Sequence, residues 1–370
     1  MRIVLTGSDG FMGANLSVRL REAGYNDVVG ITRNTSQKQF EAAIASAEFV
    51  FHLAGVNRPK SEDEFASGNA RVTEALCSML AARGVAVPIV FTSSTQAVMP
   101  NAYGRSKLAA EDALLRYGRE SGSPVYLFRL TNVFGKWARP NYNSAVATFC
   151  HNIARDLPIT VNDPAAKLRL IYIDDVADAF LSLLKSPPVE SGPVEAGPVY
   201  ETTVGEVSSV IQSFKDSRRS LVIPPVGTGL VRALYSTYVS YLPPEAFAYQ
   251  VPIYGDPRGA FAEVLKTPDC GQFSYFTAHP GITRGEHYHH SKTEKFVVIR
   301  GLARFRFRHI LTGELREIDV RGGDGYTVET VPGWAHDITN IGEDELIVML
   351  WANEIFDRAR PDTIAMKVLS

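Results

Sequence analysis

Short apolar runs alternate with amphipathic segments over the first part of the chain. Residues 2–6 are an apolar, β-branched run, and residues 15–20 after it have the apolar spacing of a helix. Further apolar runs follow at residues 28–32 and 49–53. Strands that alternate with helices are typical of a doubly wound fold, in which helices cover both faces of a parallel sheet. The pattern therefore predicts an α/β domain.

The pattern changes after residues 242–244, which contain two prolines. Residues 303–309 alternate between apolar and basic side chains, and glycine-rich turns follow them. Such alternation with regularly spaced turns is typical of a small antiparallel barrel. We therefore expect two domains, an α/β domain over residues 1–244 and an all-β domain over residues 245–370.

Length and composition agree with two domains and small ligands. The chain has 370 residues, and its 38 basic and 40 acidic side chains leave a net charge of -2. Without a block of like charge, nothing indicates nucleic acid or an anionic membrane as the main partner. Cys77, Cys150 and Cys270 form no CxxC pair, which argues against a disulfide framework or a thiolate zinc site. Because there is no signal-peptide pattern and no apolar run of membrane-spanning length, we expect a soluble, cytoplasmic protein.

A glycine-rich turn separates the first predicted strand from the first predicted helix. Gly7, Gly10 and Gly13 have the spacing G-x2-G-x2-G, and Phe11 and Met12 lie where the helix begins. Glycines at such a turn allow a tight bend, a close approach of the backbone to a pyrophosphate, and close packing of the helix. The turn therefore predicts a dinucleotide site.

The glycine spacing and several further stretches resemble the extended short-chain dehydrogenase/reductase family. The stretches are residues 49–55, residues 91–94, residues 103–107 with a Y-x3-K pair, residues 129–135 and residues 172–176. The resemblance implies a Rossmann-type fold, a nicotinamide cofactor, and a sugar-nucleotide site that includes Asn132. It assigns to the cofactor the residues Gly7, Gly10, Phe11, Met12, Gly13, Leu53, Ala54, Gly55, Tyr103 and Lys107.

Three side chains of these stretches carry the predicted reduction chemistry. Tyr103 and Lys107 are one helical turn apart, and an ammonium beside a phenol favours phenolate, which lowers the pKa from about 10. Tyr103 could donate a proton to a carbonyl oxygen that receives hydride, Ser94 could hydrogen-bond the same oxygen, and Lys107 could hold the nicotinamide ribose. The alternative is that the tyrosine and the lysine are a surface pair.

The end of the second predicted strand bears on the choice of cofactor. Residues 28–34 contain no acidic side chain that would accept hydrogen bonds from a ribose hydroxyl, whereas Arg33 could pair with a 2'-phosphate. NADPH is therefore favoured over NADH, and the alternative is that Arg33 is a solvated loop residue. Residues 94–96 are Ser-Thr-Gln where dehydratases of the family carry Thr-Asp-Glu. A reductase or a C4-epimerase is therefore expected rather than a dehydratase.

Three histidines and a glutamate of the all-β region form a candidate metal site. His287 and His289 are two residues apart on a strand and face one side, and Glu294 and His336 are expected from neighbouring strands. The spacings G-x5-H-x-H-x4-E-x6-G and G-x2-H-x3-N resemble the two motifs of the cupin superfamily, whose fold is a jelly-roll barrel. Imidazole and carboxylate suit Zn, Fe, Mn or Ni, and zinc is favoured because no redox signature is present. His290 is expected to point to the other face of the strand.

A second resemblance gives His287 a competing role. The stretches around Arg258 and Arg284 look like motifs of the dTDP-4-dehydrorhamnose 3,5-epimerase group. In that group a histidine is the general base and arginines hold nucleotide phosphates, which implies a catalytic His287 and substrate contacts by Arg258 and Arg284. A histidine bound to zinc cannot accept a substrate proton. If a metal is bound, another residue such as His290 would have to move the proton.

The whole chain resembles the family of bifunctional capsular polysaccharide enzymes that make UDP-2-acetamido-2,6-dideoxy-L-talose. The likeness is greatest in residues 57–59, 134–144, 235–243 and 353–356. The resemblance implies that the barrel epimerises C3 of a UDP-4-keto-6-deoxy-N-acetylhexosamine and that the N-terminal domain reduces C4 with NADPH. The product would serve the synthesis of UDP-N-acetyl-L-fucosamine for capsule or O-antigen, and the family resemblance implies a homodimer.

Two alternatives remain open. The first is a single-activity reductase or C4-epimerase whose barrel binds a structural metal and mediates dimerisation. A change at His287 would then leave deuterium exchange at C3 unaffected. The second is a non-enzymatic sensor of sugar nucleotides, and the presence of Ser94, Tyr103 and Lys107 speaks against it.

Overall fold

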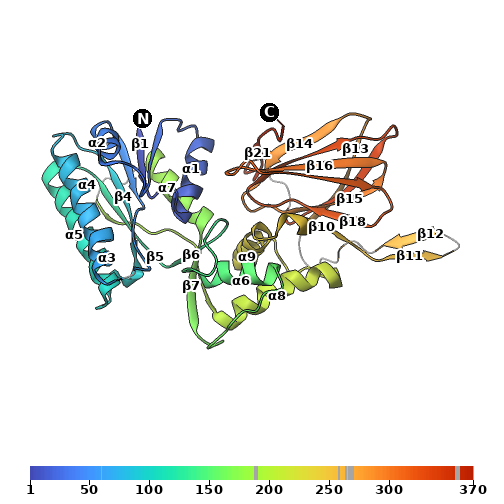
Figure 1. Cartoon of the computed structure of the whole chain (residues 1–370), viewed down its shortest axis with the longest axis horizontal. Helices are drawn as coiled ribbons and strands as arrows, with labels where there is room; N and C mark the ends of the chain where they lie inside the picture. The colour runs from blue at the N-terminus through green and yellow to red at the C-terminus, as the bar shows by residue number, and fades with distance from the viewer. Residues whose placement is uncertain are drawn as a thin grey trace. The chain divides into compact units, whose positions relative to one another are not determined.

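The computed structural model describes residues 1–59, 61–186, 191–256, 259–262, 265, 271–354 and 359–369, and Figure 1 shows their helices and strands. Contacts divide the chain into two compact units. The first unit contains Met1–Arg139 and Leu168–Glu201, and the second contains Pro140–Lys167 and Thr202–Ser370. Among the described residues, no helix combines the length and the apolar character that crossing a membrane requires.

A six-stranded parallel sheet forms the centre of the first unit, with the strand order β2-β1-β3-β4-β5-β8. The strands are β1 (Ile3–Thr6), β2 (Val28–Ile31), β3 (Phe49–His52), β4 (Ile89–Ser94), β5 (Val125–Leu130) and β8 (Gly192–Pro193). The strand order reverses between β1 and β3, where Thr6 is opposite His52. In such sheets nucleotides bind beyond the carboxyl ends of the strands at this reversal. The predicted doubly wound parallel sheet is confirmed.

Helices cover both faces of this sheet (Figure 1). One face packs against α2 (Gln37–Ala45), α4 (Val72–Ala81) and α5 (Ala102–Ser121), and the other against α1 (Phe11–Glu22) and α7 (Ile173–Lys185). Val4 and Val50 belong to the first apolar core, and Leu5 and Phe51 belong to the second. Because both faces are buried, these strands are apolar at successive positions rather than at alternate ones.

Shorter elements follow the ends of these strands. They are α3 (Asp63–Phe65), the π-helical turn η1 (Ala66–Arg71) and the 3-10 turn η2 (Thr95–Val98). A three-stranded sheet contains β6 (Asn132–Phe134), β7 (Lys167–Tyr172) and β9 (Val199–Thr203). Asn132 is opposite Leu170 in the parallel pairing of β6 with β7.

Two five-stranded antiparallel sheets form the barrel of the second unit, with the orders β10-β18-β15-β20-β13 and β17-β16-β19-β14-β21. The strands are β10 (Ala248–Gln250), β13 (Gln272–Ala278), β14 (Thr283–Tyr288), β15 (Glu294–Arg300), β16 (Leu302–His309), β17 (Leu315–Arg321), β18 (Tyr326–Glu329), β19 (Trp334–Asn340), β20 (Leu346–Ala352) and β21 (Ile364–Ala365), and β11 (Ile253–Asp256) pairs with β12 (Gly259–Ala262) apart from them. The rings of Phe296 on β15 and Phe305 on β16 are 5.9 Å apart, so the two sheets face each other across an apolar core. The predicted all-β second domain is confirmed.

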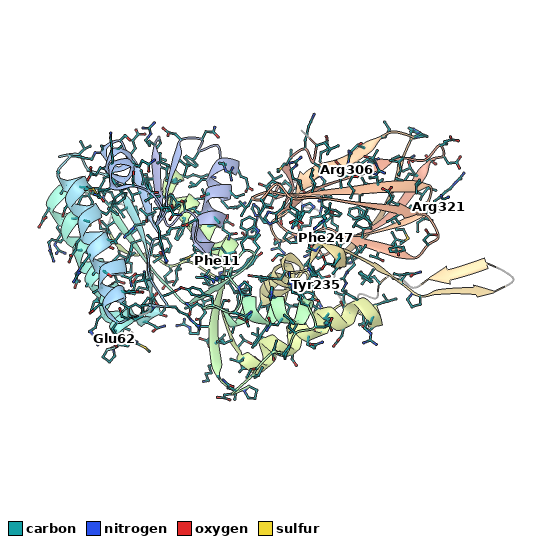
Figure 2. The ribbon with its side chains drawn as sticks, in the orientation of Figure 1. Phe11, Glu62, Tyr235, Phe247, Arg306 and Arg321 are labelled. Atoms are coloured by element: carbon teal, nitrogen blue, oxygen red, sulfur yellow. The ribbon has the colours of Figure 1, made fainter. Side chains whose placement is uncertain are left out.

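Aromatic side chains fill this core. Ala303, Phe305 and Phe307 are the buried positions of β16, as the alternation in its sequence predicts. Phe247 is fully buried, and its ring lies 5.6 Å from that of Phe307 and 5.2 Å from that of Trp334 (Figure 2). The residues just before β10 therefore belong to the packed interior of the barrel.

Helices that precede the barrel in the chain belong to the same unit. They are α6 (Ala145–Ala154), α8 (Val204–Ser220), α9 (Gly229–Ser240) and the 3-10 turn η3 (Pro244–Ala246). Buried charges fix α8 to the barrel, because Glu329 forms ion pairs with Lys295 and, at 3.2 Å, with Arg218. The Ser236 hydroxyl of α9 donates to the Ser291 carbonyl of the barrel at 2.5 Å. Contacts thus group these helices with the barrel. The predicted boundary near residue 244 would instead assign them to the N-terminal domain, and it stays a prediction.

Candidate active site and candidate metal centre

The glycine turn after β1 has the geometry that its sequence predicts. Gly7 has a φ of 69°, in the left-handed region that favours glycine, and its N–H donates to the Ile31 carbonyl at 2.8 Å. A Cβ atom on Gly13 would lie 2.1 Å from the Gly7 carbonyl oxygen. Gly10 precedes the first residue of α1, Phe11, which Figure 2 labels. The first turn of α1 therefore packs directly on the turn and presents its N–H groups there.

The predicted cofactor residues of β3 lie beside this turn. A Cβ atom on Gly7 would lie 2.9 Å from the Ala54 nitrogen, and that nitrogen donates to the Thr6 hydroxyl at 3.2 Å. His52 is buried and lies between the hydroxyls of Thr6 at 2.7 Å and Thr73 at 2.8 Å. Burial, with a contribution from the positive charge of Lys107, lowers the pKa of His52 to about 3. A neutral His52 therefore ties the end of β3 to β1, a role that sequence reasoning did not identify.

Ser94, Tyr103 and Lys107 come together at the end of β4 and the start of α5. The Asn101 side chain accepts from Gly104 N at 2.7 Å and caps α5. A Cβ atom on Gly104 would lie 2.2 Å from the Gln96 carbonyl oxygen, so the start of α5 packs closely on η2, which follows Ser94. The Ser94 hydroxyl is close enough to the phenol of Tyr103 to influence its pKa. The two side chains thus lie near each other, as a shared contact with one carbonyl oxygen would require, and their roles stay a prediction.

The electrostatics of this group differ in one respect from the prediction. Burial raises the pKa of Tyr103, and the nearby Ser94 hydroxyl opposes that rise only in part. The expected lowering of this pKa by Lys107 is wrong for the structure described, in which Lys107 Nζ donates to the Thr92 carbonyl at 2.9 Å. Burial also lowers the pKa of Lys107 to about 8, although the carboxylate of Glu111 opposes the change. The phenol thus keeps its proton at neutral pH, and the ammonium loses its proton only as the pH rises through about 8.

Asn69 supports the same group, and no motif indicated it. This buried residue lies in the π-helical turn η1. Its side chain accepts from Val56 N at 2.8 Å and donates to Val56 O at 3.0 Å and to the Ser106 hydroxyl at 2.9 Å. Ser106 in turn donates to the Tyr103 carbonyl at 2.7 Å. Asn69 therefore connects the segment after Gly55 with the helix that carries Tyr103.

Arg33 and Asn132, which have predicted roles in binding the cofactor and the sugar nucleotide, are both exposed. Arg33 is exposed in the turn after β2. Asn132 is exposed on β6, and its amide donates to the Arg169 carbonyl at 3.2 Å. An exposed Arg33 can reach a ligand at the end of β2, and the alternative of a solvated loop residue stays open.

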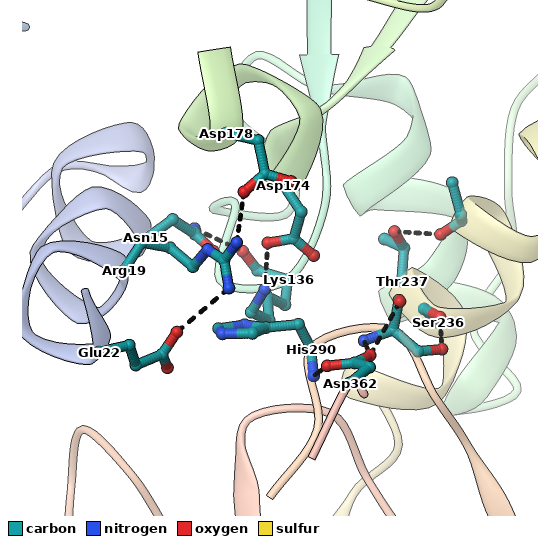
Figure 3. A network of polar contacts seen from close by, with 12 residues as sticks. Asn15, Arg19, Glu22, Lys136, Asp174, Asp178, Ser236, Thr237, His290 and Asp362 are labelled. Atoms are coloured by element: carbon teal, nitrogen blue, oxygen red, sulfur yellow. Dashed lines mark hydrogen bonds and ion pairs between the residues drawn. The ribbon is translucent and has the colours of Figure 1, made fainter. Parts of the chain in front are cut away.

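A buried ion pair supports the segment that follows β6. Lys136 is 1% exposed, and its Nζ lies 2.7 Å from Asp174 Oδ1 (Figure 3). The Asn15 amide of α1 donates to the Lys136 carbonyl at 3.2 Å. The next residue, Trp137, has a φ of 69°, which a bulky side chain rarely adopts. The contacts of Lys136 therefore hold a strained backbone directly after residues 129–135, which the family resemblance assigns to the sugar-nucleotide site.

The four predicted metal ligands converge in the second unit. His287 of β14 is opposite His336 of β19, and His289 follows β14 while Glu294 begins β15. One nitrogen or oxygen atom from each of the four lies within 4.8 Å of the others. His289 Nε2 is 3.1 Å and His336 Nε2 is 3.6 Å from Glu294 Oε2. The strand pairing thus brings together residues that are far apart in the chain.

The hydrogen bonds and the charges of this cluster suit a metal ion. His287 Nδ1 bonds to the Gly285 carbonyl at 3.0 Å and His289 Nδ1 bonds to the Asp362 carbonyl, which leaves Nε2 of each ring for a ligand. Burial and the neighbouring histidines lower the pKa of His287 to about 3. Burial raises the pKa of Glu294, but the interactions with His289, His336 and Lys292 bring this pKa well below its usual range. Neutral imidazoles and an ionised carboxylate are the forms that bind a metal, so the residues fit the group.

Arg284 and His290, which also have predicted roles in the barrel, do not belong to the metal cluster. Arg284 is exposed, donates to the Thr277 carbonyl at 2.8 Å and lies 5.2 Å from the centre of the Phe276 ring. His290 is buried, and its ring lies 5.7 Å from that of Tyr288. Arg258 lies outside the described residues. Arg284 and His290 therefore stay candidates for roles beside the metal ligands.

Two family models match the chain. The model of the NAD dependent epimerase/dehydratase family matches residues 3–195, and that of the polysaccharide biosynthesis C-terminal domain matches residues 254–364. The chain is 54% identical over 368 residues to a UDP-2-acetamido-2,6-beta-L-arabino-hexul-4-ose reductase of Pseudomonas aeruginosa, with 100% of this chain and 99% of that protein covered.

Two solved structures resemble this chain, one over its whole length and the other over part of it. The capsular polysaccharide assembling protein CapF from Staphylococcus aureus is 39% identical, with a TM-score of 0.69 and 100% of both chains covered. The UDP-glucuronic acid 4-epimerase from Bacillus cereus in complex with NAD is 18% identical, with a TM-score of 0.52, and the match covers 58% of this chain and 82% of that one. This second likeness shows the fold alone.

Proposed function

Because the chain belongs to the NAD dependent epimerase/dehydratase family, we propose that it is a bifunctional sugar-nucleotide enzyme. Its barrel inverts C3 of a UDP-4-keto-6-deoxy-N-acetylhexosamine, and its N-terminal unit reduces the C4 ketone. The product is UDP-2-acetamido-2,6-dideoxy-L-talose, a precursor for UDP-N-acetyl-L-fucosamine in capsule or O-antigen synthesis. The name of the Pseudomonas aeruginosa relative, a reductase of a hexul-4-ose, supports this substrate class.

The convergence of Ser94 at the end of β4 with Tyr103 in the first turn of α5 carries the reductase half of the proposal. Because the pKa of Tyr103 is raised, the phenol holds its proton at neutral pH and can donate it to the C4 oxygen. The Ser94 hydroxyl orients that phenol and hydrogen-bonds the same oxygen. A bound nicotinamide supplies the hydride. Lys107 adds a positive charge that favours the developing oxyanion and holds the nicotinamide ribose.

Arg33 makes NADPH the proposed cofactor. Membership of the family brings a nicotinamide cofactor, but it leaves the 2'-substituent open. An exposed guanidinium in the turn after β2 pairs with a 2'-phosphate, and residues 28–34 offer no carboxylate to bind a ribose hydroxyl.

The barrel is proposed to bind a divalent metal, with zinc as the expected ion. His287, His289, Glu294 and His336 would hold it. The charge of such an ion would polarise the C4 ketone and so favour loss of the C3 proton. As a ligand, His287 does not take that proton, so the base is another residue, for which buried His290 is the candidate.

Fusion of the two activities has a physical reason. Epimerisation next to a ketone is reversible and stops at a mixture of configurations, whereas reduction of C4 removes the ketone that acidifies C3. The N-terminal unit would therefore trap the inverted sugar as an alcohol. The expected homodimer can be checked by light scattering of the purified chain.

Incubation of the protein with the UDP-4-keto-6-deoxy-N-acetylhexosamine and NADPH in deuterated water, followed by NMR of the product, tests the proposal. We expect deuterium at C3, inverted configuration there and a reduced C4. Tyr103→Phe is expected to lose the reduction and keep the deuterium exchange, and Glu294→Gln is expected to lose the exchange. Reduction without deuterium in the unaltered protein would contradict the epimerase half and favour a structural barrel on a single-activity reductase.

A further inference from the structure

The C-terminal residues run along the strand that carries the metal ligands. Residues 359–369, here called the C-terminal strap, include β21, which pairs with His287 and Tyr288 of β14. Beyond that pairing, Met366 N donates to the Glu286 carbonyl at 2.8 Å, and Val368 is fully buried. The strap is therefore bound to the barrel on both sides of the pairing and follows the segment that contains His287.

Asp362 of the strap contacts the loop between the ligands His289 and Glu294. Its Oδ1 accepts from His290 N at 2.9 Å, and its Oδ2 accepts from Ser291 N at 2.7 Å and from Lys292 N at 2.7 Å (Figure 3). Oδ2 also accepts from the Ser291 hydroxyl at 2.9 Å. One carboxylate thus binds three successive backbone N–H groups and a side chain.

The backbone of Asp362 contacts a ligand directly. Its carbonyl oxygen accepts from His289 Nδ1, so the proton of that ring lies on Nδ1 and Nε2 faces the cluster. Three converging N–H groups form a concave site that favours an anion.

The loop has further supports that fix its ends. Thr293 N donates to the Asn353 side chain at 2.9 Å, and Glu294 N donates to the Thr330 hydroxyl at 2.8 Å. These bonds hold the end near Glu294, and the Ser236 hydroxyl and the Asn353 amide donate to the Ser291 carbonyl at 2.5 Å and 3.3 Å. The three successive N–H groups of residues 290–292 and the ring of His289 bind Asp362. The strap therefore contacts the ligand His289 directly, and it also binds the loop that connects His289 with Glu294.

We propose that Asp362 is a positioning residue of the metal centre, and that the C-terminal strap completes this centre. Asp362 orients His289 and sets the path of the loop from His289 to Glu294, but Asp362 is not a metal ligand itself. The inference rests on the proposed function in so far as the barrel binds a metal.

Metal binding by the full-length Asp362→Asn variant tests the inference. An amide at this position loses the charge and turns an N–H donor toward backbone N–H groups. The matched control is Asp319→Asn, which removes a carboxylate that Arg304 binds elsewhere on the barrel. We expect competition with a chelator to show Zn²⁺ binding weakened about ten- to hundredfold by Asp362→Asn, the range typical of residues that orient metal ligands. The control is expected to bind like the unaltered protein.

The visible spectrum of the Co²⁺-loaded proteins gives a readout that a general loss of stability does not change. We expect an altered spectrum for Asp362→Asn and an unchanged one for Asp319→Asn. If Asp362→Asn does not fold, Ser291→Ala, which removes only one of the four bonds to this carboxylate, should still weaken Zn²⁺ binding severalfold.

The outcomes separate the inference from the proposed function. If the unaltered protein binds no metal, the metal centre of the proposed function is wrong and the inference falls with it. If the unaltered protein binds Zn²⁺ and Asp362→Asn binds it equally well with the same Co²⁺ spectrum, the metal centre stands and the positioning role of Asp362 is overturned.

Discussion

We expect the reduction by the N-terminal unit to decline as the pH rises above about 8, because burial lowers the pKa of Lys107 to about 8. In the proposed mechanism, reduction requires the Lys107 ammonium near the reacting oxygen and the proton of Tyr103. The pKa of Tyr103 is raised, so the phenol loses its proton only at higher pH. The alkaline side of the pH profile of kcat/KM, which reports groups of the free enzyme, therefore belongs to Lys107.

Glu111→Gln should move this decline to lower pH. Glu111 is 2% exposed and follows Lys107 by one turn of α5, and its negative charge raises the pKa of the lysine. Charges one helical turn apart are roughly 6 Å from each other. Their interaction is about 3 kcal/mol at an effective dielectric constant of about 20 and about 0.7 kcal/mol in water. The decline should therefore shift by roughly 0.5 to 2 pH units.

The assay is kcat/KM for the UDP-linked 4-ketone across the pH range, followed by the absorbance of the nicotinamide. Asp112→Asn is the matched control, because Asp112 is the next residue of α5 and is exposed. It should leave the profile unchanged. A decline that stays in place or moves to higher pH in Glu111→Gln would refute the assignment of this limb to Lys107.

Three further changes test other parts of the molecule. Gly13→Ala would place a Cβ atom 2.1 Å from the Gly7 carbonyl oxygen, so the free energy of unfolding in urea should fall by about 1–3 kcal/mol and nicotinamide binding should weaken in a titration. Normal stability would contradict the close packing of α1. Arg33→Ala should raise the Kd of NADPH about tenfold and leave that of NADH unchanged, and equal effects on both would argue against a 2'-phosphate contact. Lys295→Met removes a cation that pairs with the buried carboxylate of Glu329, so the free energy of unfolding should fall by about 3 kcal/mol. Adding Glu329→Gln to this variant should restore part of the lost stability, and no recovery would mean that the two residues are not coupled.

Local patterns predicted much of the fold and the ligand set. The first strand, its glycine turn and the following helix occupy adjacent residues, so apolar spacing and Gly7 with Gly13 were enough to predict them. The pair of Tyr103 and Lys107 depends on one helical turn, and the alternation of residues 303–309 depends on a strand period of two. Each of these signals comes from residues close in sequence, where backbone periodicity decides which side chains share a face.

Contacts between distant segments could not be predicted in this way. Asp362 meets the loop at residues 290–292 across 70 to 72 positions of the chain, and Asn69 meets Ser106 across 37. No spacing in the sequence marks either residue, because their partners are chosen by strand pairing and helix packing. The grouping of α8 with the barrel through Arg218 and Glu329 has the same origin.

The sequence by itself determined which chemical groups the protein has and which elements carry them. The tertiary structure decided their protonation and their supports. Tyr103 illustrates the difference, since the one-turn spacing to Lys107 predicted a lowered pKa, and burial of the phenol raises it instead. Desolvation depends on everything that packs around a group, and that environment is assembled from the whole chain rather than from neighbouring residues.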